Sequence, residues 1–176
     1  NYLQTIKAMV FHLPFTKMGK KALGSYEELA DSVFNEEEKT ALLNTWKSYF
    51  EESARLNKEV GNVYTASLFL SLVSLLIFAE DLKSGDQIGL FSYGSGAVAE
   101  LLVGTIQDGF LNALNKDVIV QHFNNREAID IESYEAIFNE AVPTDDSKTT
   151  IKGPIETAGF YLAEVDAHRR YYKYRD

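Results

Sequence analysis

The stretch Val63–Ala79, VYTASLFLSLVSLLIFA, decides the fold of this chain. It has no charged residue and is hydrophobic on nearly every side, which is typical of a helix buried inside a domain. Ser67, Ser71 and Ser74 interrupt the run, and it is too short to span a bilayer comfortably. Because these serines lie three and four residues apart, they share one side of the helix. The stretch predicts a central helix that needs a close partner along its serine side.

Upstream of this helix, the sequence predicts one strand and two helices. Ile6–His12, IKAMVFH, has the character of a short buried strand, and Pro14 ends it. Thr16 can cap a helix whose inner residues recur at helical spacing: Met18, Ala22, Tyr26, Leu29 and Val33. Asn35 can cap a second helix with the inner stripe Leu42, Trp46, Tyr49, Ser53, Leu56 and Val60. The opposite face of this second helix is charged, and we expect it to face solvent.

Downstream, the sequence predicts a strand pair, a helical region and a last strand. Gln87–Tyr93 and Ala97–Ile106 are apolar strands separated by the turn residues Gly94-Ser95-Gly96. Residues 108–140 are mostly helical with a break at 124–126, residues 143–154 form an exposed loop, and residues 158–174 form a closing strand. The order of strand, helices, strand pair, helices and strand predicts an α/β layered domain with a mixed sheet.

Length, charge and cysteine content limit the possible functions. The chain has 176 residues, which predicts a single core. Its formal net charge of −9 disfavours a nucleic-acid-binding protein, and no signal peptide is visible at Asn1–Val10. We therefore expect a soluble cytoplasmic protein with no membrane and no nucleic-acid partner. Cysteine is absent, which excludes a disulfide, a thiolate metal site and a cysteine nucleophile within the chain.

His12 is the first candidate for chemistry. It stands at the end of the predicted strand, between Phe11 and Leu13-Pro14-Phe15. A histidine titrates near neutral pH, which suits general acid/base catalysis or the polarisation of a carbonyl. The alternative is a core histidine bonded to backbone. His122 and His168 lie far apart in sequence without metal-ligand spacing, and we expect structural or surface roles for both.

Three lysines follow His12 on the predicted helix. Lys17, Lys20 and Lys21 are spaced i, i+3 and i+4, so their ammonium groups should cluster near a helix N-terminus. Like charges repel there and the helix dipole disfavours cations, whereas a bound phosphate would relieve both conflicts. The alternative is an ordinary solvated lysine face.

Two further polar residues occupy positions where a ligand could approach. Asn62 precedes the apolar helix, where it can act as the N-cap or donate its amide to a substrate carbonyl. Ser95 lies in the glycine-rich turn between the strand pair, where the backbone can come close to a ligand. The alternative for this turn is a plain hairpin. The basic, tyrosine-rich tail 168–175 is best interpreted as an edge strand, although such residues can also stack on nucleic acid.

Three blocks of this sequence resemble the C-terminal half of bacterial hydroxymethylglutaryl-CoA synthases. They are FHLPFTKMGKKAL (11–23), GNVYTASLFLSLVSLL (61–76) and GLFSYGSGAVAELL (89–102), in the family's order and at compatible spacing. The likeness continues more loosely through NNRE and the tail. It implies a thiolase-like fold, in which two similar α/β halves pack around paired central helices, with residues 1–176 as the C-terminal domain.

The resemblance also implies an acyltransferase activity of the mevalonate route, the condensation of acetyl-CoA with acetoacetyl-CoA. By motif, His12 matches the histidine that assists the acetoacetyl group, and Asn62 matches the asparagine that bonds a thioester carbonyl. Ser95 matches a serine near the acetoacetyl end, and Lys17 and Lys21 match positions that contact CoA phosphates. The CoA thioesters would be substrates, and no other cofactor and no metal is implied.

The resemblance leaves this chain incomplete as an enzyme. The family's catalytic cysteine and glutamate belong to an N-terminal half, so we expect the chain alone to be inactive and the complete protein to be a homodimer. Two alternatives stay open: the related polyketide β-branching synthase, which uses carrier-protein-bound acetoacetate, and a non-catalytic scaffold subunit with the same fold.

Overall fold

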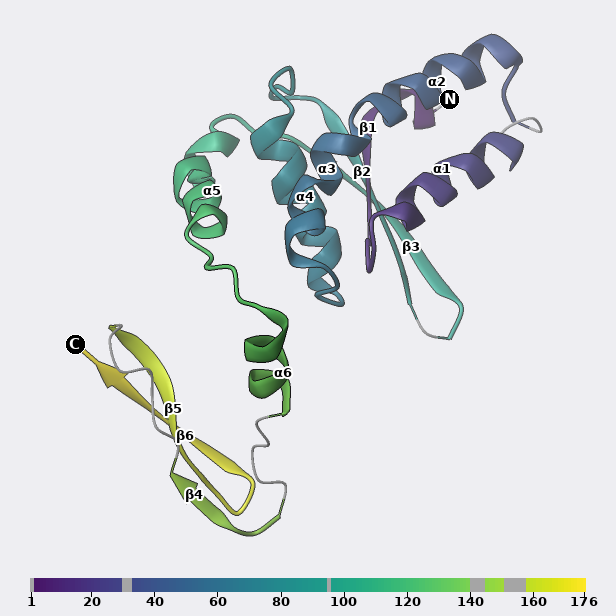
Figure 1. Ribbon diagram of the computed structural model, residues 1–176. Coiled ribbons are helices and arrows are strands. Elements are labelled where there is room, and N and C mark those ends of the chain that lie inside the picture. Colours follow the sequence, from purple (N-terminus) through teal and green to yellow (C-terminus); the bar gives the residue numbers. More distant parts are fainter. Residues whose placement is uncertain (1, 30–32, 95, 140–144, 151–157) are drawn as a thin grey trace. The chain divides into compact units, whose positions relative to one another are not determined.

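The computed structural model describes residues 2–29, 33–94, 96–139, 145–150 and 158–176 (Figure 1). The chain divides into two compact units, Asn1–Arg126 and Glu127–Asp176. The single core expected from the chain length is therefore not what the structure shows. The physical reason is that the residues after 126 form a sheet from their own strands.

A mixed three-stranded sheet forms the centre of the first unit. β1 (Ile6–Phe11) pairs in parallel with β2 (Gln87–Gly94), and β2 pairs antiparallel with β3 (Val98–Thr105). A short 3-10 helix, η1 (Tyr2–Thr5), leads into β1. The predicted mixed sheet and the predicted α/β class are both confirmed.

Helices cover both faces of this sheet, and alternation along β1 separates the two faces. Met9 and Phe11 pack with residues of α1 (Lys17–Leu29) and α2 (Glu36–Ser48). Ala8 and Val10 pack with residues of α4 (Ala66–Phe78) on the other face. The apolar stretch 63–79 thus forms the predicted central helix, although the helix starts three residues later. It is buried on one side only, because Phe69 is 56% exposed.

The long helix predicted after Asn35 is two helices, α2 and α3 (Phe50–Val60). Asn35 caps the start of α2, as the sequence predicts, and the structure shows that it forms a capping box with Glu38. The break falls at Tyr49, which ends α2 and begins α3. The predicted inner stripe is buried from Leu42 to Leu56, but Val60 is exposed. The predicted first helix is also too long, because Val33 lies beyond α1 and is exposed.

The partner on the serine side of α4 is α3 of the same chain. Ser67, Ser71 and Ser74 are fully buried. Asn57 Nδ2 donates to the carbonyl of Ser67, whereas Ser74 Oγ donates to the carbonyl of Glu52, so the two helices run antiparallel. The close partner that the sequence predicts for the serine side is therefore present, and the polar groups of α3 bond to the serines.

The remaining elements complete the first unit and build the second. They are η3 (Phe110–Ala113), α5 (Lys116–Asn124), α6 (Ile131–Asn139), β4 (Lys148–Thr150), β5 (Gly159–Asp166) and β6 (Arg169–Arg175). The predicted closing strand is a hairpin, because Ala167 and His168 turn the chain with positive φ angles. β6 is an edge strand of the sheet β4-β5-β6, which confirms that interpretation of the tail. In the described part of the chain, no helix is long and apolar enough to cross a membrane.

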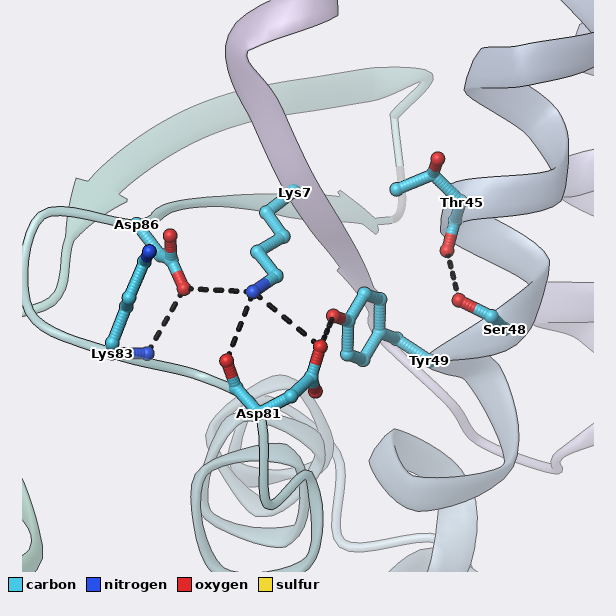
Figure 2. A network of polar contacts seen from close by, with 7 residues as sticks. All are labelled: Lys7, Thr45, Ser48, Tyr49, Asp81, Lys83 and Asp86. Carbon is cyan, nitrogen blue, oxygen red and sulfur yellow. Dashed lines mark hydrogen bonds and ion pairs between the residues drawn. The ribbon is translucent and has the colours of Figure 1, made fainter.

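A charged network holds the start of β1 (Figure 2). Lys7 Nζ lies 3.1 Å from Asp86 Oδ2 and donates to the carbonyl of Asp81 at 3.0 Å. The Tyr49 hydroxyl donates to Asp81 Oδ2, and the Lys83 amide donates to Asp86 Oδ2. The network joins β1, the α2–α3 junction and the segment between α4 and β2.

The charges in this network shift one another's pKa values. The hydrogen bond from Tyr49, followed by the charge of Lys7, lowers the pKa of Asp81. Burial acts to lower the pKa of Lys7, but the hydrogen bond to Asp86 and the neighbouring charges outweigh it, so the Lys7 pKa is raised. Both shifts favour the charged forms, which indicates that the ion pairs stabilise the fold.

We predict that Lys7→Met lowers the free energy of unfolding at neutral pH by roughly 1–3 kcal/mol, the range for a lost hydrogen bond to a charged group. The Lys7 contribution is fully present below its unfolded pKa and is lost as the pH rises through its raised folded pKa. The Asp81 contribution is present above its unfolded pKa and is lost as the pH falls through its lowered folded pKa. Denaturant unfolding across pH should show the wild type and variant converging at both extremes. A constant difference at all pH values would contradict the assignment.

Gly19 allows α1 to lie directly against the core. A Cβ atom at Gly19 would lie 2.4 Å from Cε2 of Phe50 and 2.9 Å from Cδ2 of Leu13, both of which are buried. A Cβ atom at Gly24 of the same helix would meet nothing within 4 Å. The close approach at Gly19 sets the position of the first turns of α1, which carry Lys17 and Lys21.

The two glycines of α1 should respond in opposite ways to alanine. Gly19→Ala should destabilise the chain by roughly 1–3 kcal/mol, because it overpacks a fixed aromatic ring. Gly24→Ala should stabilise it by roughly 0.5–1 kcal/mol through helix propensity alone. Denaturant unfolding of the two variants measures both values, and equal effects would show that the contact with Phe50 is unimportant.

Candidate functional site

His12 lies directly after the carboxyl end of β1. Its amide donates to the carbonyl of Phe91 at 2.9 Å, which extends the parallel pairing with β2 past the last strand residue. Leu13 is buried beside it, whereas the histidine side chain is partly exposed. The backbone is therefore fixed on both sides of a ring that remains accessible from solvent.

Tyr93 packs edge-on against the imidazole of His12. The two ring centroids are 5.3 Å apart with an interplanar angle of 78°. The Tyr93 hydroxyl donates to Met18 Sδ of α1 at 3.1 Å, and burial raises the pKa of Tyr93. Tyr93 thus holds one side of the histidine ring and connects it to the lysine-bearing helix.

The predicted hairpin between β2 and β3 is present, and its turn contains the predicted site residue Ser95. Gly94 pairs with Val98 across the turn, and Gly96 has a φ of +84°. Ser95 lies outside the described residues, so its role near the substrate stays a prediction.

Asn62 is exposed in the turn between α3 and α4. Its side-chain Oδ1 accepts a hydrogen bond from the Tyr64 amide at 2.8 Å, forming a local Asx turn. The expected N-cap role is wrong, since Thr65 is the residue that precedes α4. Because Oδ1 is engaged in the turn, the group of this exposed side chain that is left to bind a ligand carbonyl is the donor Nδ2.

A buried polar network connects the His12 strand end with the Asn62 turn. Ser71 Oγ lies 3.0 Å from the carbonyl oxygen of Phe11 and 3.1 Å from Asn57 Oδ1. Asn57 Nδ2 donates to the carbonyl of Ser67 at 3.1 Å, and the Asn57 carbonyl accepts from the Gly61 amide at 2.9 Å. The network thus joins the residue before His12 to the residue before Asn62.

The hydroxyl of Ser67 extends this network into the turn. It accepts a hydrogen bond from the Val63 amide at 3.2 Å, directly after Asn62. Asn57 is only 3% exposed, and its role was not anticipated from the sequence. The sequence does contain a signal for Asn57. It follows Ser53 by one helical turn and so continues the polar part of an otherwise apolar helix face.

The three lysines of α1 have different surroundings. Lys20 Nζ forms an ion pair with Glu51 of α3 at 2.6 Å, and Lys58 binds the same carboxylate. Hydrogen bonds from Lys20 and Lys58 lower the pKa of Glu51 to about 2. Lys17 and Lys21 are exposed, and no described residue forms an ion pair with either. The expected cluster of three free cations is therefore a pair, with Lys20 neutralised by an acid.

The other two histidines lie outside this site. His122 is exposed on α5, and His168 Nε2 lies 3.6 Å from Asp146 in the hairpin of the second unit. Within the described residues, no group of three or more histidine, aspartate or glutamate side chains could hold a metal ion. The predicted site residues that the structure describes are a histidine directly after β1, an asparagine before α4 and two exposed lysines on α1.

Comparison with known proteins identifies the family. The model of the hydroxymethylglutaryl-coenzyme A synthase C-terminal region matches residues 27–175. A hydroxymethylglutaryl-CoA synthase of Enterococcus faecalis is 44% identical over 142 residues, covering 81% of this chain and 35% of the relative. The polyketide 3-hydroxy-3-methylglutaryl-ACP synthase PksG of Bacillus subtilis is 29% identical over 138 residues, covering 78% of this chain and 32% of the relative.

A solved structure extends the match over nearly the whole chain. A crystal structure of a hydroxymethylglutaryl-CoA synthase complexed with CoA has a TM-score of 0.80 and 36% identity, covering 97% of this chain and 42% of that one. The chain therefore spans well under half the length of these relatives. His12, Lys17 and Lys21 precede the part matched by the family model, whereas Asn62 lies within it. Taken with the thiolase-like fold, these matches mean that the chain belongs to the hydroxymethylglutaryl-CoA synthase family and corresponds to its C-terminal region.

Proposed function

We propose that this chain is the C-terminal catalytic and CoA-binding part of an acyltransferase that condenses acetyl-CoA with acetoacetyl-CoA to hydroxymethylglutaryl-CoA. The observation that carries the proposal is the buried network of Asn57, Ser67 and Ser71, which holds together the two segments bearing His12 and Asn62. These two residues match the family's histidine and asparagine by motif. A scaffold without catalysis would need the buried network for its fold, but it has no need of His12, Asn62 and Ser95 together.

His12 acts on the ketone of the acetoacetyl group in this proposal. A partly exposed imidazole on a fixed backbone can donate a hydrogen bond to the ketone oxygen and stabilise the alkoxide that develops when the new carbon–carbon bond forms. Nδ2 of Asn62 donates to the thioester carbonyl and orients the substrate. The acetylated cysteine and the glutamate that handles the acetyl proton belong to the N-terminal part of the family's proteins, so this chain alone is inactive.

Lys17 and Lys21 bind the phosphates of CoA. They lie one turn apart at the start of α1, and the helix N-terminus adds backbone amides that favour an anion. The CoA complex of a structural relative supports this substrate class. In the same proposal, Ser95 contacts the acetoacetyl end of the substrate, and catalysis uses no metal or additional cofactor. The complete protein is a homodimer in the cytoplasm and catalyses a step of the mevalonate route.

A second candidate is the condensation on a carrier protein in polyketide β-branching. The 29% identity to PksG supports keeping it. The free pair of Lys17 and Lys21 favours a phosphate ligand, which both free CoA and a phosphopantetheine carrier provide. Comparing acetoacetyl-CoA with carrier-bound acetoacetate as substrates separates the two.

We predict that His12→Ala, made in the full-length protein, lowers the turnover of acetoacetyl-CoA condensation by about 10²- to 10⁴-fold, the usual contribution of a general acid/base. The loss of acetoacetyl-CoA absorbance measures the rate. His122→Ala is the matched control and should leave it unchanged. Turnover only with carrier-bound acetoacetate would shift the assignment to polyketide branching, and no turnover with either substrate would leave the scaffold alternative.

The lysines give a prediction that this chain can test without catalysis. Lys17→Ala and Lys21→Ala should each weaken CoA binding by roughly 3- to 10-fold, as expected for the loss of a charged contact to phosphate. Lys20→Ala is the control, because Lys20 is engaged by Glu51, and its effect should be under twofold. Calorimetric titration with CoA measures the three affinities. Equal losses for all three lysines would mean that only the general positive charge matters.

A further inference from the structure

Arg126 connects the end of α5 to the end of α3. Its Nη1 donates to the backbone carbonyl of Glu59, and its Nη2 lies 2.8 Å from Glu59 Oε2. Its Nε donates to the carbonyl of Phe123, and its guanidinium lies 5.0 Å from the centre of the Phe123 ring. One planar side chain therefore contacts a carbonyl, a carboxylate and the last turn of the preceding helix α5.

The guanidinium of Arg126 supplies the hydrogen-bond donor that the Glu59 carbonyl lacks at the end of α3. In a continuing helix this carbonyl would accept from the amide of Val63, four residues later. The Val63 amide instead donates to Ser67 Oγ. The carbonyl of Glu59 is thus one of the unpaired acceptors at a helix C-terminus, where a cation is also favoured by the helix dipole.

The anchored carbonyl lies three residues before Asn62. Between them, the Gly61 amide bonds to the Asn57 carbonyl, and Gly61 has a φ of +80° that ends the helix. After Asn62, the Val63 and Tyr64 amides are both bound by side chains. The turn is therefore held on its α4 side by Ser67, and on its α3 side by Asn57 and the guanidinium of Arg126.

We infer that Arg126 is a positioning residue for Asn62: it fixes the end of α3 and thereby aims the Asn62 amide at the substrate. The inference rests on the proposed function in one respect, which is the identity of the substrate that Asn62 binds. Arg126 touches no substrate itself. Its planar fork suits the two simultaneous contacts, which a lysine cannot reproduce.

Amide hydrogen exchange on the full-length protein tests the inference without any activity. In Arg126→Ala the amides of Val63 and Tyr64 should exchange several-fold faster than in the wild type, because opening of the turn becomes easier. Arg55→Ala is the control: its guanidinium stacks 3.9 Å from the Phe78 ring, at the opposite end of α4. Unchanged exchange of Val63 and Tyr64 in Arg126→Ala would overturn the inference.

A double-mutant cycle in the full-length protein tests the link to Asn62. Arg126→Ala should lower kcat/KM for acetoacetyl-CoA about 10-fold, since a small displacement of a substrate-positioning group has effects of that order. Arg126→Lys should restore part of this loss. In an Asn62→Ala background, Arg126→Ala should have almost no further effect on kcat/KM. The reason is that Arg126 acts by positioning the side-chain amide of Asn62, which this background lacks.

The outcomes separate this inference from the proposed function. Losses that multiply in the double variant would overturn the positioning role, because a general structural effect is independent of Asn62. A wild-type protein without condensation activity would refute the proposed function instead, and the exchange measurement alone would then decide the role of Arg126.

Discussion

The hydroxyl of Ser71 is the contact on which the arrangement of this domain depends. It is fully buried and lies close to oxygens from β1, α3 and its own helix α4. The single hydroxyl proton is shared among these acceptors, and Asn57 Oδ1 and the Phe11 carbonyl, both buried, find a polar partner on α4 only where the three elements meet at Ser71. Apolar packing alone would allow the helices to slide, because hydrophobic contact is not directional.

The same polar contacts explain how a mainly apolar domain carries a defined site. Two segments far apart in sequence, at His12 and Asn62, end at the two sides of the network formed by Asn57, Ser67 and Ser71. The reactive side chains remain accessible while their backbones are fixed. Such preorganisation is what catalysis by orientation and charge stabilisation requires. The charged network around Lys7 likewise fixes the backbone at the opposite end of β1, where it supports the fold only.

Charge pairing also determines which cations are available to a ligand. The sequence places Lys17, Lys20 and Lys21 on one helix face, yet Glu51 engages only Lys20. A carboxylate from a neighbouring helix thereby turns a general basic face into a pair of lysines. The selectivity arises from packing, because Gly19 brings α1 close to Phe50 at the start of α3, next to Glu51.

The sequence by itself determined the α/β class, the central apolar helix at 63–79, the strand that leads into His12 and the helix start capped by Asn35, because each depends on periodicity or on residues within a few positions. Only the tertiary structure decided that Tyr49 divides a long helix, that α3 covers the serines, that Asn62 forms an Asx turn, and that the tail folds into a hairpin. Each of these depends on a partner or a backbone turn that helical or strand spacing does not specify. Arg126 and Glu59 illustrate the limit well, since a contact between the end of α3 and the segment after α5 has no periodic signal in the sequence.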